Sequence, residues 1–317
     1  MNKNRLFLLL VFFLTIHGYA THAQDSSLVK ISDTSIINLR DSLKAFEAEL
    51  DSLLHPKKSY FKIEVGFISN NVYFGRKDSI ATPYITPQIG YHHKSGLYVN
   101  ALASYLPTPG QNRFDLFTLE AGYNKIFGNL QMQLTANKFF YNSNSYNVMS
   151  EIKENFMAAF SYETNIITPV LEGSLIVADK TDFAGTFGLE HAFYAFNDHL
   201  DIAPSVVVNA STQNYNSSYY RFRRYALKRF RRPLNYTITA EVIDPEKFKV
   251  LDYEISLPVN YTAKKFSVSI TPAYAIPVNP ANLRVTRKIG NFITREKDHY
   301  EKLSESFFIQ ASISYKL

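Results

Sequence analysis

The C-terminal stretch 306–317, SFFIQASISYKL, decides the fold. Apolar residues recur at every second position and share one face, whereas the residues between them are polar apart from Phe308. A period of two predicts a β-strand with one apolar and one polar face. The apolar face carries Phe307, Ile309, Ala311, Ile313, Tyr315 and Leu317.

The same alternation recurs upstream, in residues 130–137, 200–211, 251–262 and 266–278. These strands run roughly 10 to 14 residues, against about 5 or 6 in soluble proteins. Their polar faces consist mostly of Ser, Thr, Asn, Gln and carboxylates, as a water-filled lumen requires. Long strands with one fully apolar face favour a membrane barrel over a soluble sheet.

Twelve candidate strands follow one another along the chain. They cover roughly residues 60–74, 83–93, 96–106, 114–126, 129–141, 154–164, 168–179, 182–196, 199–214, 248–263, 265–278 and 305–317. Short and long connectors alternate between them, with 180–181 as an exception on the long side. Short turns at one end and long loops at the other are typical of outer-membrane barrels. We therefore predict an all-β fold: an antiparallel transmembrane β-barrel of about 12 strands with a short N-terminal periplasmic helix.

The first part of the chain has a different character. Residues 1–23 combine basic residues, an apolar run and a small-residue end, which predicts a signal peptide. Residues 24–58 form a periplasmic segment, in which 36–54 has apolar residues at helical spacing. That helix either lies on the protein's own surface, which we favour, or mediates self-association as a short coiled coil. Residues 59–317 form the barrel.

Composition removes several classes of protein. The chain has 317 residues, no cysteine and a mean hydropathy of −0.16. Disulfides and thiolate metal sites are therefore excluded. The longest apolar run, 6–16, is too short for a membrane-spanning helix. The sequence contains no phosphate-binding glycine loop, HExxH motif or calcium loop, so we expect no cofactor and no metal site.

These features resemble the outer-membrane β-barrel proteins of Gram-negative bacteria. The resemblance covers the signal peptide and residues 60–317, and the ending 307–317 is similar to the insertion signal of such proteins. It departs from their common terminal Phe by ending in Leu317. The resemblance implies an outer-membrane location with both termini periplasmic. It says little about activity, because pores, enzymes, adhesins and scaffolds share the fold.

Charge is concentrated in two predicted extracellular loops, 215–247 and 279–303. The candidate residues for the pore mouth, or for binding anions or lipopolysaccharide, are Arg221, Arg223, Arg224, Lys228, Arg229, Arg231, Arg232, Arg284, Arg287 and Lys288. They either face lipopolysaccharide phosphates or fold into the mouth and narrow it. We do not expect nucleic acid as a partner of these residues, because the predicted signal peptide directs the chain to the cell envelope. The predicted lumen-facing carboxylates are Glu64, Glu120, Glu172, Glu190, Asp252 and Glu254.

Three functions follow in order of preference. The first is a small pore for small solutes, with anions favoured if the basic loops line its mouth. The second is a non-conducting structural or interaction barrel that binds lipopolysaccharide or an envelope partner. The third is a lipid hydrolase, because His93 and Ser95 are similar to the His-x-Ser motif of outer-membrane lipid hydrolases. No third residue that would orient His93 is evident, so we expect no catalytic site.

Overall fold

In the computed structural model, the described residues are 58–77, 82–108, 110, 112–145, 147, 149–220, 237–289 and 292–317. The chain divides into two compact units, 1–57 and 58–317, and the described residues belong to the second. The predicted signal peptide and the predicted helix 36–54 lie outside the described residues. Both stay predictions.

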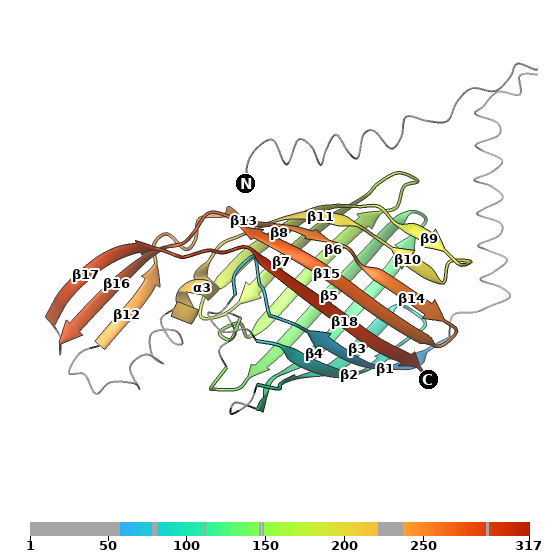
Figure 1. The fold of residues 1–317 in the computed structure, drawn as a ribbon, viewed down its shortest axis with the longest axis horizontal. Helices are drawn as coiled ribbons and strands as arrows, with labels where there is room; N and C mark the ends of the chain where they lie inside the picture. Colours follow the sequence, from blue (N-terminus) through green and yellow to red (C-terminus); the bar gives the residue numbers. More distant parts are fainter. Residues whose placement is uncertain are drawn as a thin grey trace, which may run out of the picture. The chain divides into compact units, whose positions relative to one another are not determined.

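The second unit is a closed antiparallel β-barrel (Figure 1). Pairing of the first strand with the last and of β13 with β15 joins the sheet into a ring. The ring, in chain order, is β1 (Tyr60–Ile68), β2 (Tyr84–His92), β3 (Leu97–Leu106), β4 (Arg113–Phe127), β5 (Leu130–Tyr141), β6 (Glu154–Tyr162), β7 (Thr168–Val177), β8 (Thr181–Glu190), β11 (Ser205–Ser211), β13 (Lys249–Ser256), β15 (Phe266–Pro277) and β18 (Ser306–Lys316). The predicted twelve-stranded antiparallel barrel is thus confirmed.

The two faces of the strands differ as their sequences require. In β1, Phe61, Ile63, Val65 and Phe67 are exposed on the outside, whereas Glu64 and Gly66 face inward. The same alternation of exposed apolar residues continues through β4, β5 and β7. An exposed apolar belt of this kind suits lipid, because a barrel that closes on itself leaves no unpaired backbone edge in the membrane.

Three adjacent strands of the ring are interrupted. β9 (Phe193–Ala195) continues β8, β10 (Leu200–Ile202) precedes β11, and β14 (Val259–Ala263) continues β13. Pro204 and Pro258 lie in two of these breaks, where proline cannot donate a ladder hydrogen bond. Both proline carbonyls still accept one, from the amides of His191 (3.2 Å) and Ala203 (2.9 Å). The breaks therefore interrupt the regular ladder without opening the wall.

Two regions that the sequence analysis treated as loops contain regular structure. Helix α3 (Asn214–Tyr219) follows β11, and β12 (Thr237–Val242), β16 (Asn282–Ile289) and β17 (Phe292–Tyr300) form a separate antiparallel sheet. Figure 1 shows this small sheet beyond the end of the barrel where α3 lies. The expectation of plain loops was wrong there, because charged residues in β16 and β17 conceal a period of two. Within the described residues, no helix is long and apolar enough to cross a membrane.

We call the end of the barrel that carries α3 and the small sheet the long-loop end. The opposite end, where Tyr60 begins β1 and the chain finishes at Leu317, is the short-turn end (Figure 1). Both ends of the described chain therefore meet on the same side of the barrel.

A glycine lets a lumenal tyrosine lie flat against the wall. The Tyr98 hydroxyl hydrogen-bonds the Thr135 hydroxyl at 2.8 Å across the strand that contains Gly122. A Cβ placed on Gly122 would lie 2.4 Å from the Tyr98 ring and 2.6 Å from the Leu134 carbonyl oxygen. Only a residue without a side chain fits between them.

We therefore expect Gly122→Ala to lower the free energy of unfolding by about 1–3 kcal/mol, the usual cost of overpacking. Urea unfolding of the refolded barrel in detergent, followed by its heat-modifiable gel mobility, would measure this. Gly173→Ala is the matched control, because a Cβ placed on Gly173 meets no atom within 4 Å. Equal midpoints for the two variants would contradict the interpretation.

Candidate functional site

The long-loop end is filled by a buried core built from several connectors. Tyr215 of α3 is 0% exposed, and its ring lies 5.3 Å from the ring of Tyr73, which belongs to the connector after β1. The buried residues of this core are Ile152, Ile176, Ala178, Ala184, Tyr215, Tyr220, Ala240, Val242, Ala281 and Leu283. We call this set the loop core. It places apolar side chains of the connectors against the inner wall, which narrows the passage there.

Asp182 fixes α3 against the wall. Its carboxylate accepts hydrogen bonds from the backbone amides of Asn214 and Tyr215, each at 2.7 Å, and from the Thr212 hydroxyl at 2.5 Å. These are the free amides of the helix N-terminus, where a negative charge is most favourable. The side chain is 0% exposed, so this contact is the anchor of the helix.

Arg76 ties three connectors together at the same end. Its side chain is buried and pairs with Glu301 (Nε to Oε2, 3.2 Å). It also donates to the Gln213 side chain at 3.4 Å and to the Asn279 carbonyl at 3.3 Å. Glu301 accepts a further hydrogen bond from the Tyr220 hydroxyl at 3.0 Å. A buried ion pair with these extra donors is well satisfied, so it favours one arrangement of the connectors.

Tyr215 lies beside this network with its hydroxyl buried, and the hydroxyl has no hydrogen-bond partner among the described residues. Burial raises the pKa of Tyr215 above its ordinary value, and nearby Arg76 partly opposes that effect. The phenol is therefore neutral at any physiological pH, and it contributes to the loop core by packing rather than by charge.

A second polar anchor lies around Asp115. Its carboxylate accepts hydrogen bonds from the Tyr84 hydroxyl (2.5 Å) and the Ser145 hydroxyl (2.7 Å). Arg113 pairs with the other carboxylate oxygen at 2.8 Å. The connector between β5 and β6 is thereby held at the rim. Sequence reasoning missed Asp115, Asp182 and Arg76, because nothing in their local pattern reveals which distant loops they meet.

The predicted basic residues are described only in part. Arg221, Arg223, Arg224, Lys228, Arg229, Arg231 and Arg232 lie outside the described residues, and their role stays a prediction. Arg284 lies on β16, where Asp298 and Glu296 flank it at 3.2 and 3.3 Å. The hydrogen bond to Asp298 and both charges raise the pKa of Arg284. Arg287 and Lys288 lie further along the same strand.

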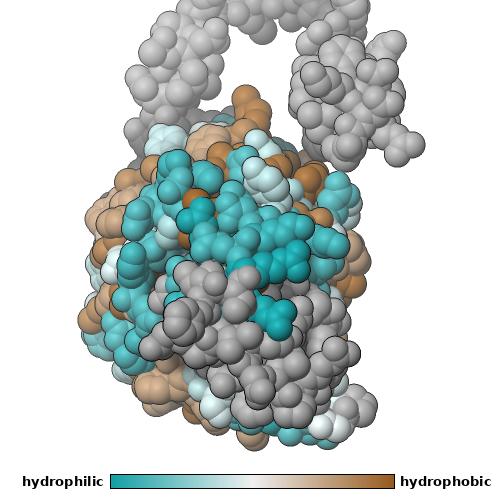
Figure 2. All heavy atoms as spheres, turned by 90° about the vertical axis from the view of Figure 1, so that its left-hand side faces the viewer, coloured by the Kyte–Doolittle hydropathy of each residue, from teal (hydrophilic) through white to brown (hydrophobic). Residues whose placement is uncertain are grey.

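Hydrophilic side chains gather on the described surface of the long-loop end, with apolar residues around its sides (Figure 2). Arg284, Arg287 and Lys288 belong to the small sheet and not to the barrel wall, because β16 pairs with β12 and β17.

The structure places all six predicted carboxylates on the inner face of their strands. Glu64 pairs with Lys62 at 2.6 Å, and Glu120 accepts a hydrogen bond from Asn100 at 2.7 Å. The other four, Glu172, Glu190, Asp252 and Glu254, come from β7, β8 and β13 on one side of the ring. They have no ion pair among the described residues. We call them the acidic wall.

The rows of the sheet bring members of this wall into line. Glu172 lies opposite Thr186, Thr186 opposite Asn209, and Asn209 opposite Asp252. The Thr186 hydroxyl donates to the Asn209 side chain at 2.6 Å within that row. Asp201 on β10 also lies near, and its side chain accepts from Asn260 at 3.3 Å. Sequence reasoning missed Asp201 as a lumenal carboxylate, although it alternates with apolar Leu200 and Ile202.

A polar cavity of about 510 Å³ opens at the short-turn end. Its lining mixes turn residues with lumenal side chains, among them Gln131, Gln133, Ser161, Thr168 and Glu190. The inner face of the barrel is therefore mostly polar at this end, whereas an apolar core lies at the other.

His93 and Ser95 lie together, as the His-x-Ser pattern would require. The His93 Nδ1 atom is 2.9 Å from the Ser95 hydroxyl and 3.3 Å from the Ser95 amide. Both residues belong to the exposed turn between β2 and β3, and Ser95 also interacts with the amide of Leu97 at 3.5 Å. These contacts stabilise the turn itself. The absence of a catalytic site stays a prediction.

A closed ring of twelve antiparallel strands, apolar outside and polar inside, defines an outer-membrane β-barrel protein. Among solved structures of similar fold are the KdgM porin (9% identity, TM-score 0.42, covering 81% of this chain and 99% of that chain) and the NanC porin (12%, 0.42, 81% and 100%). LpxR from Salmonella typhimurium is also similar (9%, 0.44, 80% and 99%). These likenesses concern the fold and assign no activity. No protein-family model and no curated protein sequence matches the chain.

We expect Arg76→Met to loosen the loop core, because removing one partner of a buried ion pair costs about 3–5 kcal/mol. Amide hydrogen exchange of α3 should then become faster, since the helix lies against the same connectors. Lys77→Met is the matched control: Lys77 is adjacent, and among the described residues its side chain makes one exposed contact, with the Glu305 carbonyl. Unchanged exchange in Arg76→Met would show that the ion pair does not hold the core.

Proposed function

We propose that the protein is an outer-membrane channel for small polar solutes, with a long-loop end narrowed by its own connectors. The supporting observation is the polar lumen, with a cavity of about 510 Å³ at the short-turn end. Away from the loop core, the lumenal side chains are mostly Ser, Thr, Asn, Gln and carboxylates. A polar interior suits water and solutes, whereas a purely structural barrel of this size has no need of one.

Orientation follows the plan of outer-membrane barrels. In this proposal the short-turn end, with the start of β1 and Leu317, faces the periplasm, and the long-loop end faces outward. The small sheet with Arg284, Arg287 and Lys288 then lies on the outer side, together with the basic residues of 221–232. Anionic lipopolysaccharide phosphates are natural partners for exposed Arg and Lys at that level.

The loop core acts as the gate of this channel. Movement of α3 away from the wall would require the buried contacts of Asp182 and Tyr215 to open. The anchors hold one arrangement of the connectors, and breaking them would release the connectors as a unit, because packed cores do not deform continuously. Conductance should therefore occur in steps between a narrow and a wide state.

Two features of opposite charge act on a permeating ion. The basic loops favour anions, which is the expectation drawn from the sequence. The acidic wall favours cations, and it lines the barrel along the path itself. Because charges nearest the path dominate selectivity, we propose that the channel favours cations, and that the basic loops act on approach from outside.

Planar-bilayer recording of the refolded barrel across a salt gradient tests this proposal. At about 0.1 M salt, where charges act over about 10 Å, the reversal potential should show cation preference. Glu172→Gln with Glu254→Gln should weaken that preference. Glu246→Gln, an exposed carboxylate outside the lumen, is the control that should leave it unchanged. Anion preference in the unmodified protein would contradict this proposal and would show that the basic loops determine ion selectivity.

A second candidate function is a non-conducting barrel that presents its outer sheet to an envelope partner. The burial of α3 and of the two residues before it at the long-loop end favours it, because Thr212, Gln213, Asn214, Tyr215 and Asn216 are all buried there. An inserted protein that stays silent, and that begins to conduct with Arg76→Met, is a gated channel. A protein that stays silent in both forms is the non-conducting barrel.

A further inference from the structure

An apolar strip crosses the acidic wall of the barrel. The register of β7, β8, β11 and β13 sets the inward-facing residues of these strands into rows. One row consists of Val170, Gly188, Val207 and Glu254. The next row toward the short-turn end contains Glu190, and the next toward the long-loop end contains Glu172 and Asp252. Carboxylates therefore surround a row that is apolar on three strands.

Val207 forms the centre of this strip. A Cβ placed on Gly188 would lie 2.8 Å from Val207 Cγ1, so the valine side chain covers the glycine of the neighbouring strand. Val170, on the other side of Gly188, lines the polar cavity of about 510 Å³ together with Glu190 and Thr168. The cavity at the short-turn end therefore offers both a carboxylate and an apolar surface.

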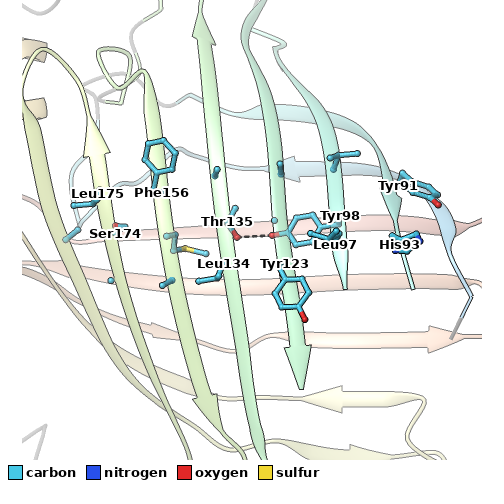
Figure 3. A pocket seen from close by; sticks show the side chains of 18 of the residues that line it. Tyr91, His93, Leu97, Tyr98, Tyr123, Leu134, Thr135, Phe156, Ser174 and Leu175 are labelled. Atoms are coloured by element: carbon cyan, nitrogen blue, oxygen red, sulfur yellow. Dashed lines mark hydrogen bonds between the residues drawn. The ribbon is translucent and has the colours of Figure 1, made fainter. Parts of the chain in front are cut away.

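On another part of the inner face, polar side chains are paired with one another. The Tyr98 hydroxyl of β3 and the Thr135 hydroxyl of β5 share a hydrogen bond (Figure 3), and the Gln133 side chain donates to both, at 3.2 and 3.3 Å. On β4, the Glu120 carboxylate accepts a hydrogen bond from Asn100 at 2.7 Å. Hydrogen bonds within the wall therefore occupy these groups.

Asp252 lacks such a partner although it is buried. It is 1% exposed, and neither of its carboxylate oxygens has a hydrogen-bond partner in the part of the chain that the structure describes. The connector after β1 covers it, since a Cβ placed on Gly75 would lie 2.8 Å from Asp252 Cβ. Arg76 of the same connector forms its ion pair with Glu301. A buried carboxylate is stable as an anion only when it is paired, so a cation from outside the protein would find a partner here.

The sheet geometry fixes the spacing of these carboxylates. Successive inward-facing residues of one strand lie about 7 Å apart, so Glu254 and Asp252 are separated by about that distance along β13. Glu190 and Glu254 are one row and two strands apart, which corresponds to about 12 Å between their Cα atoms. Val207 lies between them on β11. A ligand that reaches both carboxylates must therefore be elongated and must cross an apolar surface.

We propose that the acidic wall binds a linear diamine or polyamine. In this arrangement one ammonium group lies at Glu190 in the cavity, and another lies between Glu254 and Asp252, where it pairs with the buried carboxylate. The alkyl chain between the two ammonium groups covers Val207 and removes its surface from water. The inference rests on the proposed function, because it names the class of solute that the acidic wall of the channel selects.

The same residues are a poor site for an inorganic cation. Mg²⁺ requires near-octahedral coordination by oxygen, and among the described residues no group of three His, Cys, Asp or Glu side chains is arranged to hold a metal ion. Val207 adds nothing to the binding of a hydrated ion, whereas it favours an alkyl chain. An ammonium group needs fewer ligands, since it has three N–H donors that neighbouring carboxylates can accept.

Isothermal titration calorimetry of the refolded protein in an uncharged detergent tests the inference. The probes are 1,8-diaminooctane, 1,3-diaminopropane and Mg²⁺, which carry the same double positive charge and differ in length and in apolar surface. We expect 1,8-diaminooctane to bind about tenfold more tightly than either of the others. Glu254→Gln should abolish this difference by removing the second ammonium site, and Val207→Thr, which keeps the shape of the side chain, should reduce it.

Glu120→Gln is the matched control, because Glu120 is a lumenal carboxylate of β4 that has Asn100 as its partner. It should leave all three affinities unchanged. Glu190→Gln, with the same expected effect, replaces Glu254→Gln if the latter does not show the heat-modifiable mobility of a folded barrel. Equal affinities for the three cations, or a difference that persists in the Glu→Gln variant of the acidic wall, would overturn the inference.

The outcome for the diamine site can be told apart from the outcome for the channel. Cation-selective conductance together with equal affinities for the three cations would refute the diamine site and leave the proposed function intact. Selective binding of 1,8-diaminooctane by an inserted protein that stays silent, also with Arg76→Met, would support the diamine site and refute the channel.

Discussion

Closure of the backbone hydrogen-bond ladder is the constraint on which this structure depends. Inside a membrane an unpaired amide or carbonyl costs several kcal/mol, so a sheet can span lipid only as a ring. The pairing of β13 with β15 completes that ring in spite of the breaks at Pro204 and Pro258. Proline is tolerated there because its carbonyl still accepts a bond from the neighbouring strand. The enclosed lumen exists because the wall is closed.

Buried polar groups also need partners at the long-loop end, where the connectors pack together. Asp182, Asp115 and Glu301 each accept several hydrogen bonds from connectors that are far apart in the sequence. Buried carboxylates are stable only when they are satisfied in this way. Each therefore selects one arrangement of the loops around it. Apolar side chains of the loop core fill the long-loop end, and the polar anchors fix the arrangement of the connectors there.

The strands could be predicted from the sequence because lipid outside and water inside impose a strict period of two on every strand. The interrupted strands were also found as single units, since their alternation continues across Pro204 and Pro258. The lumenal position of Glu172 and Glu254 follows from the same period of two.

The small outer sheet was missed, because neither face of β17 is apolar where it is described. Arg76 and Glu301 are 225 residues apart, and no local pattern encodes such a pairing.

The pairing of β1 with β18 bears on how the molecule is assembled. Ile63 lies opposite Tyr315, so the two ends of the barrel sequence form neighbouring strands. Each other ring strand can pair with one that follows it more closely in the chain, but this seam cannot form until β18 has been made. Contacts of such large sequence separation are slow to form. Until the seam closes, β1 and β18 both present open edges that can pair with other chains. Synthesis of β18 thus determines when the protein stops being prone to aggregation, and a chain truncated before β18 would keep an open edge.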